Sequence, residues 1–203
     1  MTCAIELVVK LGGSLQSQVD LRDICVRLDR SLLGSPSMIV PGGGLLADGV
    51  RNLDVLHSLQ PGTSHWMAVL ALDQNGLMLG DLVPRGIPVT SIREAELACG
   101  RGDLPILLPS DLLMAKDPLP GNWDVTSDSI SCWAAVRFGA GRLLILKDSL
   151  PEGSMTAEGF SKRGWLDRFF PDQFRIFEGK AWIGNGRFPE EALSGKGIIE
   201  ILR

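Results

Sequence analysis

The sequence lacks the features that mark a membrane protein, a secreted protein or a nucleic-acid-binding protein. No apolar run approaches the roughly 20 residues that span a bilayer, and Met1 is followed too soon by an apolar strand for a signal peptide to fit. The 24 acidic residues outnumber the 20 Lys and Arg residues, and the net charge of −4 provides no basic field for nucleic acid. We therefore expect a soluble cytoplasmic protein that contacts neither a membrane nor nucleic acid.

Candidate metal ligands are also scarce. The chain has four cysteines and two histidines, and no cysteines form a C-x-x-C pair. Such scattered cysteines indicate neither a zinc site nor a disulfide framework, and we expect them to be small buried apolar residues. The sequence therefore predicts no metal site built from its own side chains.

The common nucleotide-binding fingerprints are missing as well. The chain contains no G-x-x-x-x-G-K-[ST] motif, no G-x-G-x-x-G motif after a strand and no protein-kinase signature. Any phosphate site must therefore use glycine turns of another kind.

Such a turn follows the first apolar strand. The run from Ile5 to Leu11 is interrupted only by Lys10 and stops at Gly12-Gly13-Ser14. Adjacent glycines let the backbone approach a ligand and direct N–H groups toward it. Strand, cation, glycine turn and helix start together predict an anion site, most simply for a phosphate. The alternative is a strand that ends in a tight turn, with the Lys10 side chain extending to solvent.

A second glycine turn supports the phosphate interpretation. Apolar residues recur at helical spacing between Leu21 and Leu33, and Met38–Pro41 then leads into Gly42-Gly43-Gly44 and a helical turn over 45–51. Two successive strands that deliver glycine turns to one edge are typical of an open, largely parallel sheet. In such sheets, ligands bind beyond the carboxyl ends of the strands.

The rest of the chain continues this α/β alternation. Predicted helices cover 65–82, 94–99, 130–136 and 165–170, and predicted strands cover 87–92, 104–108, 143–146, 181–183 and 197–202. Residues 111–122 and 153–163 carry turn-forming residues and are predicted to be loops.

Two aspartates four residues apart precede the helix at 130–136. Thr126 or Ser127 is a good N-cap, and Asp128 suits the first turn on dipole grounds alone, which leaves Asp124 unexplained. Phosphoryl transfer needs two phosphates held in line and positive charge between them. Lys10 and Lys147 can supply that charge, with Asp128 holding their ammonium groups in place.

Together these motifs resemble those of the amino acid kinase family. The similar segments are Val8–Ser14, Val40–Gly44 and Asp124–Asp128, in that order. Within the family, Lys10–Ser14, His65–Met67, Asp117–Pro120 and Trp123–Ser129 most resemble the aminomethylfuran phosphate kinases of methanofuran biosynthesis.

The resemblance implies an α/β fold, a three-layer αβα sandwich with a mostly parallel central sheet. It implies one domain over 1–203, with an acceptor-binding lobe (1–116) and a nucleotide-binding lobe (117–203). It further implies transfer of the γ-phosphoryl group from ATP, with Mg²⁺, to a small phosphorylated acceptor, and assembly as a homo-oligomer. A transferase of the same fold whose acceptor is a carboxylate or a carbamate is a further alternative.

The resemblance also implies roles for individual residues. Catalysis falls to Lys10, Asp128 and Lys147. Phosphate and nucleotide binding fall to Gly12, Gly13, Ser14, Asp124, Ser127, Asp148 and Lys162. Acceptor binding falls to Gly42, Gly43, Gly44, Asp48 and His65.

One departure from the family pattern follows the strand at 143–146. The usual Asp-Val-x-Gly turn is replaced by Asp148-Ser149-Leu150-Pro151. The second catalytic lysine is therefore either Lys147 or Lys162. The same departure favours an alternative function, a nucleotide- or anion-binding relative without transferase activity.

Overall fold

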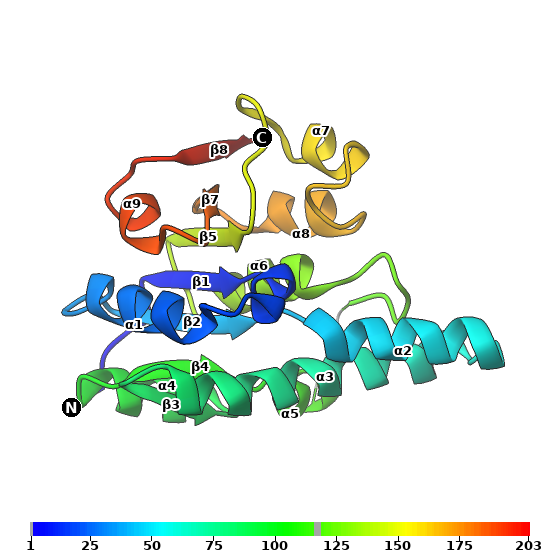
Figure 1. The fold of residues 1–203 in the computed structure, drawn as a ribbon, viewed down its shortest axis with the longest axis horizontal. Coiled ribbons are helices and arrows are strands. Elements are labelled where there is room, and N and C mark those ends of the chain that lie inside the picture. Colours follow the sequence, from blue (N-terminus) through cyan, green and yellow to red (C-terminus); the bar gives the residue numbers. More distant parts are fainter. Residues whose placement is uncertain (1, 116–118) are drawn as a thin grey trace.

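An eight-stranded sheet forms the centre of the computed structural model, which describes residues 2–115 and 119–203. The strand order is β3-β4-β2-β1-β5-β7-β8-β6, and only the β7–β8 pairing is antiparallel among the described strands (Figure 1). The strands are β1 (Leu7–Leu11), β2 (Ser37–Pro41), β3 (Gly86–Val89), β4 (Leu104–Leu107), β5 (Arg142–Lys147), β6 (Met155–Thr156), β7 (Lys180–Asn185) and β8 (Ile198–Leu202). The mostly parallel sheet confirms the predicted fold class.

Helices cover both faces of this sheet and complete three layers. They are the 3-10 helix η1 (Gly13–Ser17), α1 (Leu21–Ser31), α2 (Gly44–His57), α3 (Pro61–Leu82), α4 (Ile92–Gly100), α5 (Ser110–Ala115), α6 (Ser127–Arg137), α7 (Ala157–Lys162), α8 (Phe170–Ile176) and α9 (Pro189–Leu193). In Figure 1, α2 extends beyond the end of the sheet. In the described part of the chain, no helix is both long enough and apolar enough to cross a membrane.

The core divides into two apolar clusters, one on each face. Successive strand residues point to opposite faces, and in β1 this places Val8 in one cluster and Leu7 and Val9 in the other. The Val8 cluster includes Ile130 and other residues of α6. The same alternation places Lys10 on the α6 face.

Several predicted boundaries were wrong. Residues 153–163 are not a loop, because they contain β6 and α7. The Thr156 hydroxyl caps α7 by accepting a hydrogen bond from the Gly159 N–H at 3.1 Å, and Ala157 and Phe160 are buried. Core packing and the cap outweigh the glycines that favoured a loop.

The helix predicted at 165–170 begins only at Phe170. Pro171 follows at the second helical position, where its missing N–H costs nothing. The strand predicted over 87–92 ends at Val89, because the Ser91 hydroxyl caps α4 by accepting from the Glu94 N–H at 3.2 Å. Helix α9 was not predicted.

The loop predicted over 111–122 is partly helical, because α5 occupies its first residues. Helices α2 and α3 are longer than the predicted 45–51 and 65–82. The Asp117-Pro118 dipeptide and the predicted lobe boundary at 116/117 lie outside the described residues.

Candidate active site

Strand register brings both glycine turns to one edge of the sheet. Leu11 of β1 lies beside Pro41 of β2 and also beside Leu146 of β5. The residues that follow these positions therefore leave the sheet together. The prediction that both turns reach the same edge is confirmed.

The two turns pack backbone against backbone. A Cβ atom on Gly13 would lie 2.7 Å from the Gly44 Cα, and one on Gly42 would lie 2.9 Å from the Gly13 Cα. A Cβ atom on Gly12 would lie 2.5 Å from the Leu146 carbonyl oxygen. Real Cβ atoms do not come so close to backbone atoms, so these positions require glycine.

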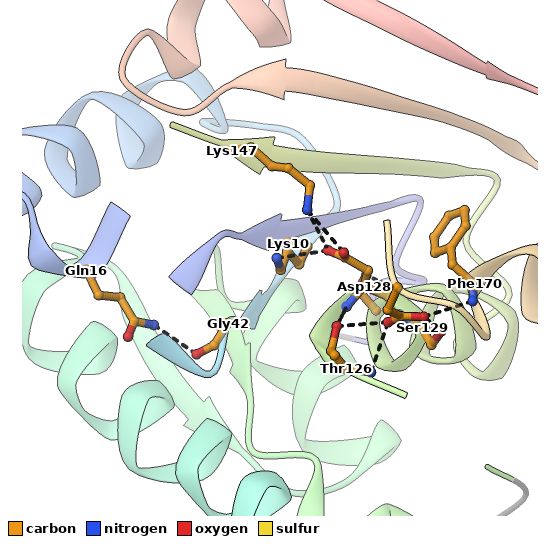
Figure 2. A network of polar contacts seen from close by, with 10 residues as sticks. Lys10, Gln16, Gly42, Thr126, Asp128, Ser129, Lys147 and Phe170 are labelled. Atoms are coloured by element: carbon orange, nitrogen blue, oxygen red, sulfur yellow. Dashed lines mark hydrogen bonds and ion pairs between the residues drawn. The ribbon is translucent and has the colours of Figure 1, made fainter. Parts of the chain in front are cut away.

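A buried carboxylate lies between two lysines beside these turns. The Lys10 Nζ is 2.9 Å from the Asp128 Oδ1, and the Lys147 Nζ is 3.1 Å from the Asp128 Oδ2 (Figure 2). The side chains of Lys10 and Asp128 are 5% and 7% exposed. The structure therefore brings these three predicted residues together, whereas Lys162 lies elsewhere.

The geometry of the sheet brings Lys10 and Lys147 close to Asp128. Lys10 shares its face with Val8, and Lys147 shares its face with Ile145, which belongs to the same apolar cluster as Val8. Both lysines stand near the carboxyl ends of adjacent parallel strands. Helix α6 packs on that face and supplies Asp128.

The N-terminal cap of α6 determines where Asp128 lies along the helix. Thr126 is the N-cap, and its hydroxyl accepts a hydrogen bond from the Asp128 N–H. Asp128 therefore lies in the first turn, where the helix dipole also favours its negative charge. Asp128 therefore interacts favourably with the dipole of α6 and contacts both lysines at the same time.

The electrostatics keep this carboxylate ionised. Burial would raise the pKa of Asp128, but Lys10 and Lys147 outweigh burial and bring the pKa to about 2. Burial lowers the pKa of Lys10 below its usual value, and Asp128 opposes that fall. Both ammonium groups contact this one carboxylate, and each ammonium group has three N–H donors, so donors are left for a further anion.

Sequence reasoning missed Asp167, which supports the start of α6. Its carboxylate accepts hydrogen bonds from the N–H and hydroxyl groups of Thr126 (2.9 and 2.8 Å), from the N–H and hydroxyl of Ser129, and from the Phe170 N–H (2.8 Å). Burial raises the pKa of Asp167, and the nearby Asp128 raises it further. No local pattern links Asp167 to a helix start some 40 positions earlier in the chain.

A cavity of about 320 Å³ opens above the two lysines. It is lined by eleven of the predicted residues, namely Lys10, Gly12, Gly13, Ser14, Gly43, Gly44, Asp48, His65, Ser127, Asp128 and Lys147. Four predicted residues are not among its lining residues, namely Gly42, Asp124, Asp148 and Lys162. Asp148 is an exposed residue directly after β5 and lines neither this cavity nor the one described next.

A second, more open cavity of about 800 Å³ adjoins the first. Asp124 and Lys162 line it, together with Arg168, and Trp123 and Thr126 line both cavities. The Arg168 guanidinium lies 3.5 Å from the Asp124 carboxylate, and their side chains are 85% and 48% exposed. The Asp124–Arg168 ion pair at the rim of this second cavity is therefore exposed to solvent.

Sequence reasoning also missed the role of Trp123 at the wall of the first cavity. The indole N–H donates to the Asp54 carboxylate, and the Arg51 guanidinium lies 4.8 Å from the ring centre. Arg51 in turn contacts Asp48 at 2.9 Å. Helix α2 thus holds an aromatic ring, a cation and carboxylates at this wall, and the buried His65 of α3 also faces the cavity.

The carboxylates near the two cavities are the ligands that a magnesium ion would require. Across residues 2–115 and 119–203, no group of three or more His, Cys, Asp or Glu side chains is placed to hold a metal. Mg²⁺ in phosphate-handling sites usually keeps several waters and uses one or two carboxylates plus substrate phosphates. The single carboxylate of Asp124 beside the second cavity fits that role.

Comparisons with known proteins match the chain to a kinase family and to a kinase of similar length. Residues 6–149 match the sequence profile of the amino acid kinase family. The [5-(aminomethyl)furan-3-yl]methyl phosphate kinase of Methanocaldococcus jannaschii is 27% identical over an alignment of 201 positions, and the match covers 92% of this chain and 90% of that protein.

Solved structures of kinases share the fold. The uridylate kinase of Archaeoglobus fulgidus superposes with a TM-score of 0.73 at 15% identity, over 98% of this chain and 100% of that chain. The UMP kinase of Ureaplasma parvum gives 0.76 at 14% identity, over 98% and 97%. The carbamate kinase of Giardia lamblia bound to AMP-PNP gives 0.62 at 12% identity, over 100% of both chains.

Proposed function

Because the chain belongs to the amino acid kinase family, we propose that it transfers the γ-phosphoryl group of ATP to a small acceptor that already carries a phosphate. The products are ADP and a diphosphate. The observation that carries this proposal is the buried Asp128 between Lys10 and Lys147, beside two glycine turns packed against each other.

The reaction needs little covalent help from the protein. An oxygen of the acceptor phosphate forms a bond to the γ-phosphorus, and the bond from that phosphorus to the β–γ bridging oxygen breaks. Lys10 and Lys147 place positive charge where negative charge passes between donor and acceptor. Asp128 holds both ammonium groups in place through its two ion pairs.

The protonation state of Asp128 fits an acceptor that is already ionised. With its pKa held at about 2 by the two lysines, this carboxylate is a poor base at neutral pH. A phosphate oxygen needs no deprotonation before it attacks. An alcohol would need a base, which Asp128 does not supply.

We assign the acceptor to the side of the cavity formed by Gly42–Gly44 and α2. The N–H groups at the start of α2 have no partner within the helix and suit an acceptor phosphate. Asp48 provides a carboxylate for an ammonium group, and Trp123 provides an aromatic surface for a planar ring. An aminomethylfuran phosphate, the substrate named for the archaeal relative, has all three features.

We assign the nucleotide to Gly12–Ser14 and the second cavity. Lys162 provides a cation for the phosphates there, and Asp124 provides a carboxylate for the accompanying Mg²⁺. The metal would neutralise charge on the donor phosphates. Asp124 and Lys162 belong to the predicted nucleotide lobe of residues 117–203, whereas Gly12–Ser14 comes from the part of the chain predicted to form the acceptor lobe.

The direct test is ADP release from ATP and Mg²⁺ with [5-(aminomethyl)furan-3-yl]methyl phosphate, beside UMP and carbamate. We expect turnover with the furan phosphate, a diphosphate product in equal amount to ADP, and much weaker activity with the other two acceptors. Calorimetric binding of ATP without turnover on any acceptor would contradict transfer and favour a binding protein. Faster turnover with UMP or carbamate would contradict the furan assignment.

A further inference from the structure

The carbonyl groups of the second glycine turn (Gly42–Gly44) accept hydrogen bonds from two side-chain amides. The Gly42 carbonyl accepts from the Asn75 Nδ2 at 2.8 Å and from the Gln16 Nε2 at 2.9 Å (Figure 2 shows the Gln16 contact). The Gly43 carbonyl accepts from the same Asn75 Nδ2 at 2.7 Å and from the Ala47 N–H at 3.1 Å. Both acceptor positions of each carbonyl are therefore occupied.

Asn75 makes these contacts from a buried position on α3. The residue is 3% exposed, and both amide protons of its side chain are used on two successive carbonyls. It is not among the residues that line the cavity. Its contacts therefore act on the backbone of the turn.

The orientation of these carbonyls sets the orientation of the N–H groups that follow. A trans peptide points its carbonyl and the next N–H in opposite directions. With the Gly42 and Gly43 carbonyls held by Asn75, the directions of the Gly43 and Gly44 N–H groups are fixed as well, and both residues line the cavity.

The backbone angles of the turn agree with this orientation. Gly43 is right-handed helical with φ −71° and ψ −36°, and Gly44 has a positive φ of 51°. A right-handed residue followed by a left-handed one makes successive N–H groups converge in a nest for an anion. A Cβ atom at Gly44 would displace the Gln16 side chain, and the positive φ of Gly44 also favours glycine there.

We infer that Asn75 is the positioning residue of the acceptor phosphate site, because it holds the Gly43 and Gly44 N–H groups on the cavity side. This inference rests on the proposed function, and it assigns the role to a residue that does not touch the substrate. Gln16 assists by holding the Gly42 carbonyl from η1, which belongs to the other glycine turn. Gln16 thereby also joins the donor side to the acceptor side.

The test compares Asn75→Leu and Asn75→Asp with the wild type. Leucine keeps a similar volume without donors, and an ionised aspartate places oxygens against two carbonyl oxygens. We expect the KM for the furan phosphate to rise about tenfold or more, which corresponds to the loss of one or two hydrogen bonds. The KM for ATP should stay within about twofold, because the nucleotide side is not held by Asn75.

Leu79→Ala is the matched control for general destabilisation. Leu79 lies about one turn further along α3, is fully buried, and packs in the cluster of Leu7 and Val9 away from the turn. This variant should lower the melting temperature and leave both KM values unchanged. Equal changes in both KM values for Asn75→Leu would overturn the inference, as would an unchanged KM for the acceptor.

A second variant covers the case in which the Asn75 variants do not fold. Gln16→Leu removes one donor to the Gly42 carbonyl at a partly buried site. It should raise the acceptor KM about two- to threefold, which is smaller because Asn75 still holds both carbonyls. No rise would overturn the inference.

Binding of inorganic phosphate separates this inference from the proposed function. If the wild type turns over no acceptor, calorimetry with phosphate still reports on the turn. Binding by the wild type that weakens about tenfold in Asn75→Leu, or about twofold in Gln16→Leu, supports the inference without any kinase activity. Equal binding in all proteins, or none in the wild type, overturns it.

Discussion

The two cavities that meet at Trp123 are constructed differently. In the first, Lys10 and Asp128 form an ion pair shielded from solvent, and the backbone of both glycine turns is packed without room for side chains. In the second, Asp124 and Arg168 form an ion pair whose side chains are largely in water. The difference shows where the fold enforces geometry and where it leaves the geometry adjustable.

That difference matches the needs of phosphoryl transfer. Charge that stabilises a transition state must be fixed in advance in a water-poor site, where it acts most strongly. Charge that only gathers a nucleotide can sit at a solvated rim, where an ion pair contributes little to stability. Changes in the first cavity should therefore affect kcat, and changes at the rim should affect KM slightly.

The largest effect should come from Lys10→Ala. Removing a fixed cation beside the transferred group should lower kcat by about 10²- to 10³-fold, while circular dichroism shows an intact fold. Lys162→Ala at the open rim is the matched control and should lower kcat by less than about threefold. Near-normal turnover of Lys10→Ala would remove the distinction between the cavities.

Asp128→Asn should have the next largest effect and should change the pH profile. Asp128 opposes the fall in the Lys10 pKa that burial causes, so its loss lowers that pKa further. Activity needs the protonated lysine and is lost as pH rises through this pKa. The alkaline limb of the kcat profile should therefore move to lower pH, with a kcat about 10- to 100-fold lower. A limb that stays in place would contradict the role given to Asp128.

Asp167→Asn tests how far the rigid region extends behind the first cavity. The change puts an amide NH₂ against backbone N–H donors, so unfolding should need about 1–3 kcal/mol less free energy. The kcat should fall about tenfold, because Asp128 shifts with the start of α6. Asp172→Asn, which changes an exposed carboxylate of α8, is the control and should alter neither quantity. Loss of stability with an unchanged kcat would limit Asp167 to the fold.

The smallest effect should come from Asp124→Ala. Its exposed pair with Arg168 contributes at most about 1 kcal/mol to stability, so the melting temperature should hardly change. The KM for MgATP should rise by about two- to fivefold, because the carboxylate that we assign to Mg²⁺ is lost. A large fall in kcat instead would mean that the second cavity requires geometry as fixed as that of the first cavity.

Local patterns were enough to predict the centre of the site. Lys10 at a strand end, two glycine turns and Asp128 in a first helical turn are each short-range signals, and parallel pairing brings them together. The phase of the strand even determines which face Lys10 occupies. These features follow from periodicity and turn chemistry.

Long-range contacts explain what the sequence did not reveal. Asn75 lies inside a helix and contacts carbonyls more than 30 positions earlier, and Asp167 contacts a helix start nearly 40 positions earlier. Neither residue has a local motif, because its partners are backbone groups that any sequence possesses. The segment around α7 was missed for a related reason, since burial of Phe160 is a tertiary effect.

The most direct measurement is a crystal structure with AMP-PNP, Mg²⁺ and the acceptor phosphate bound together. We expect the γ-phosphoryl group within about 3 Å of the Lys10 Nζ, on the line to an acceptor phosphate held by the Gly43 and Gly44 N–H groups. A γ-phosphoryl group outside the first cavity, or an acceptor phosphate away from Gly43 and Gly44, would contradict it.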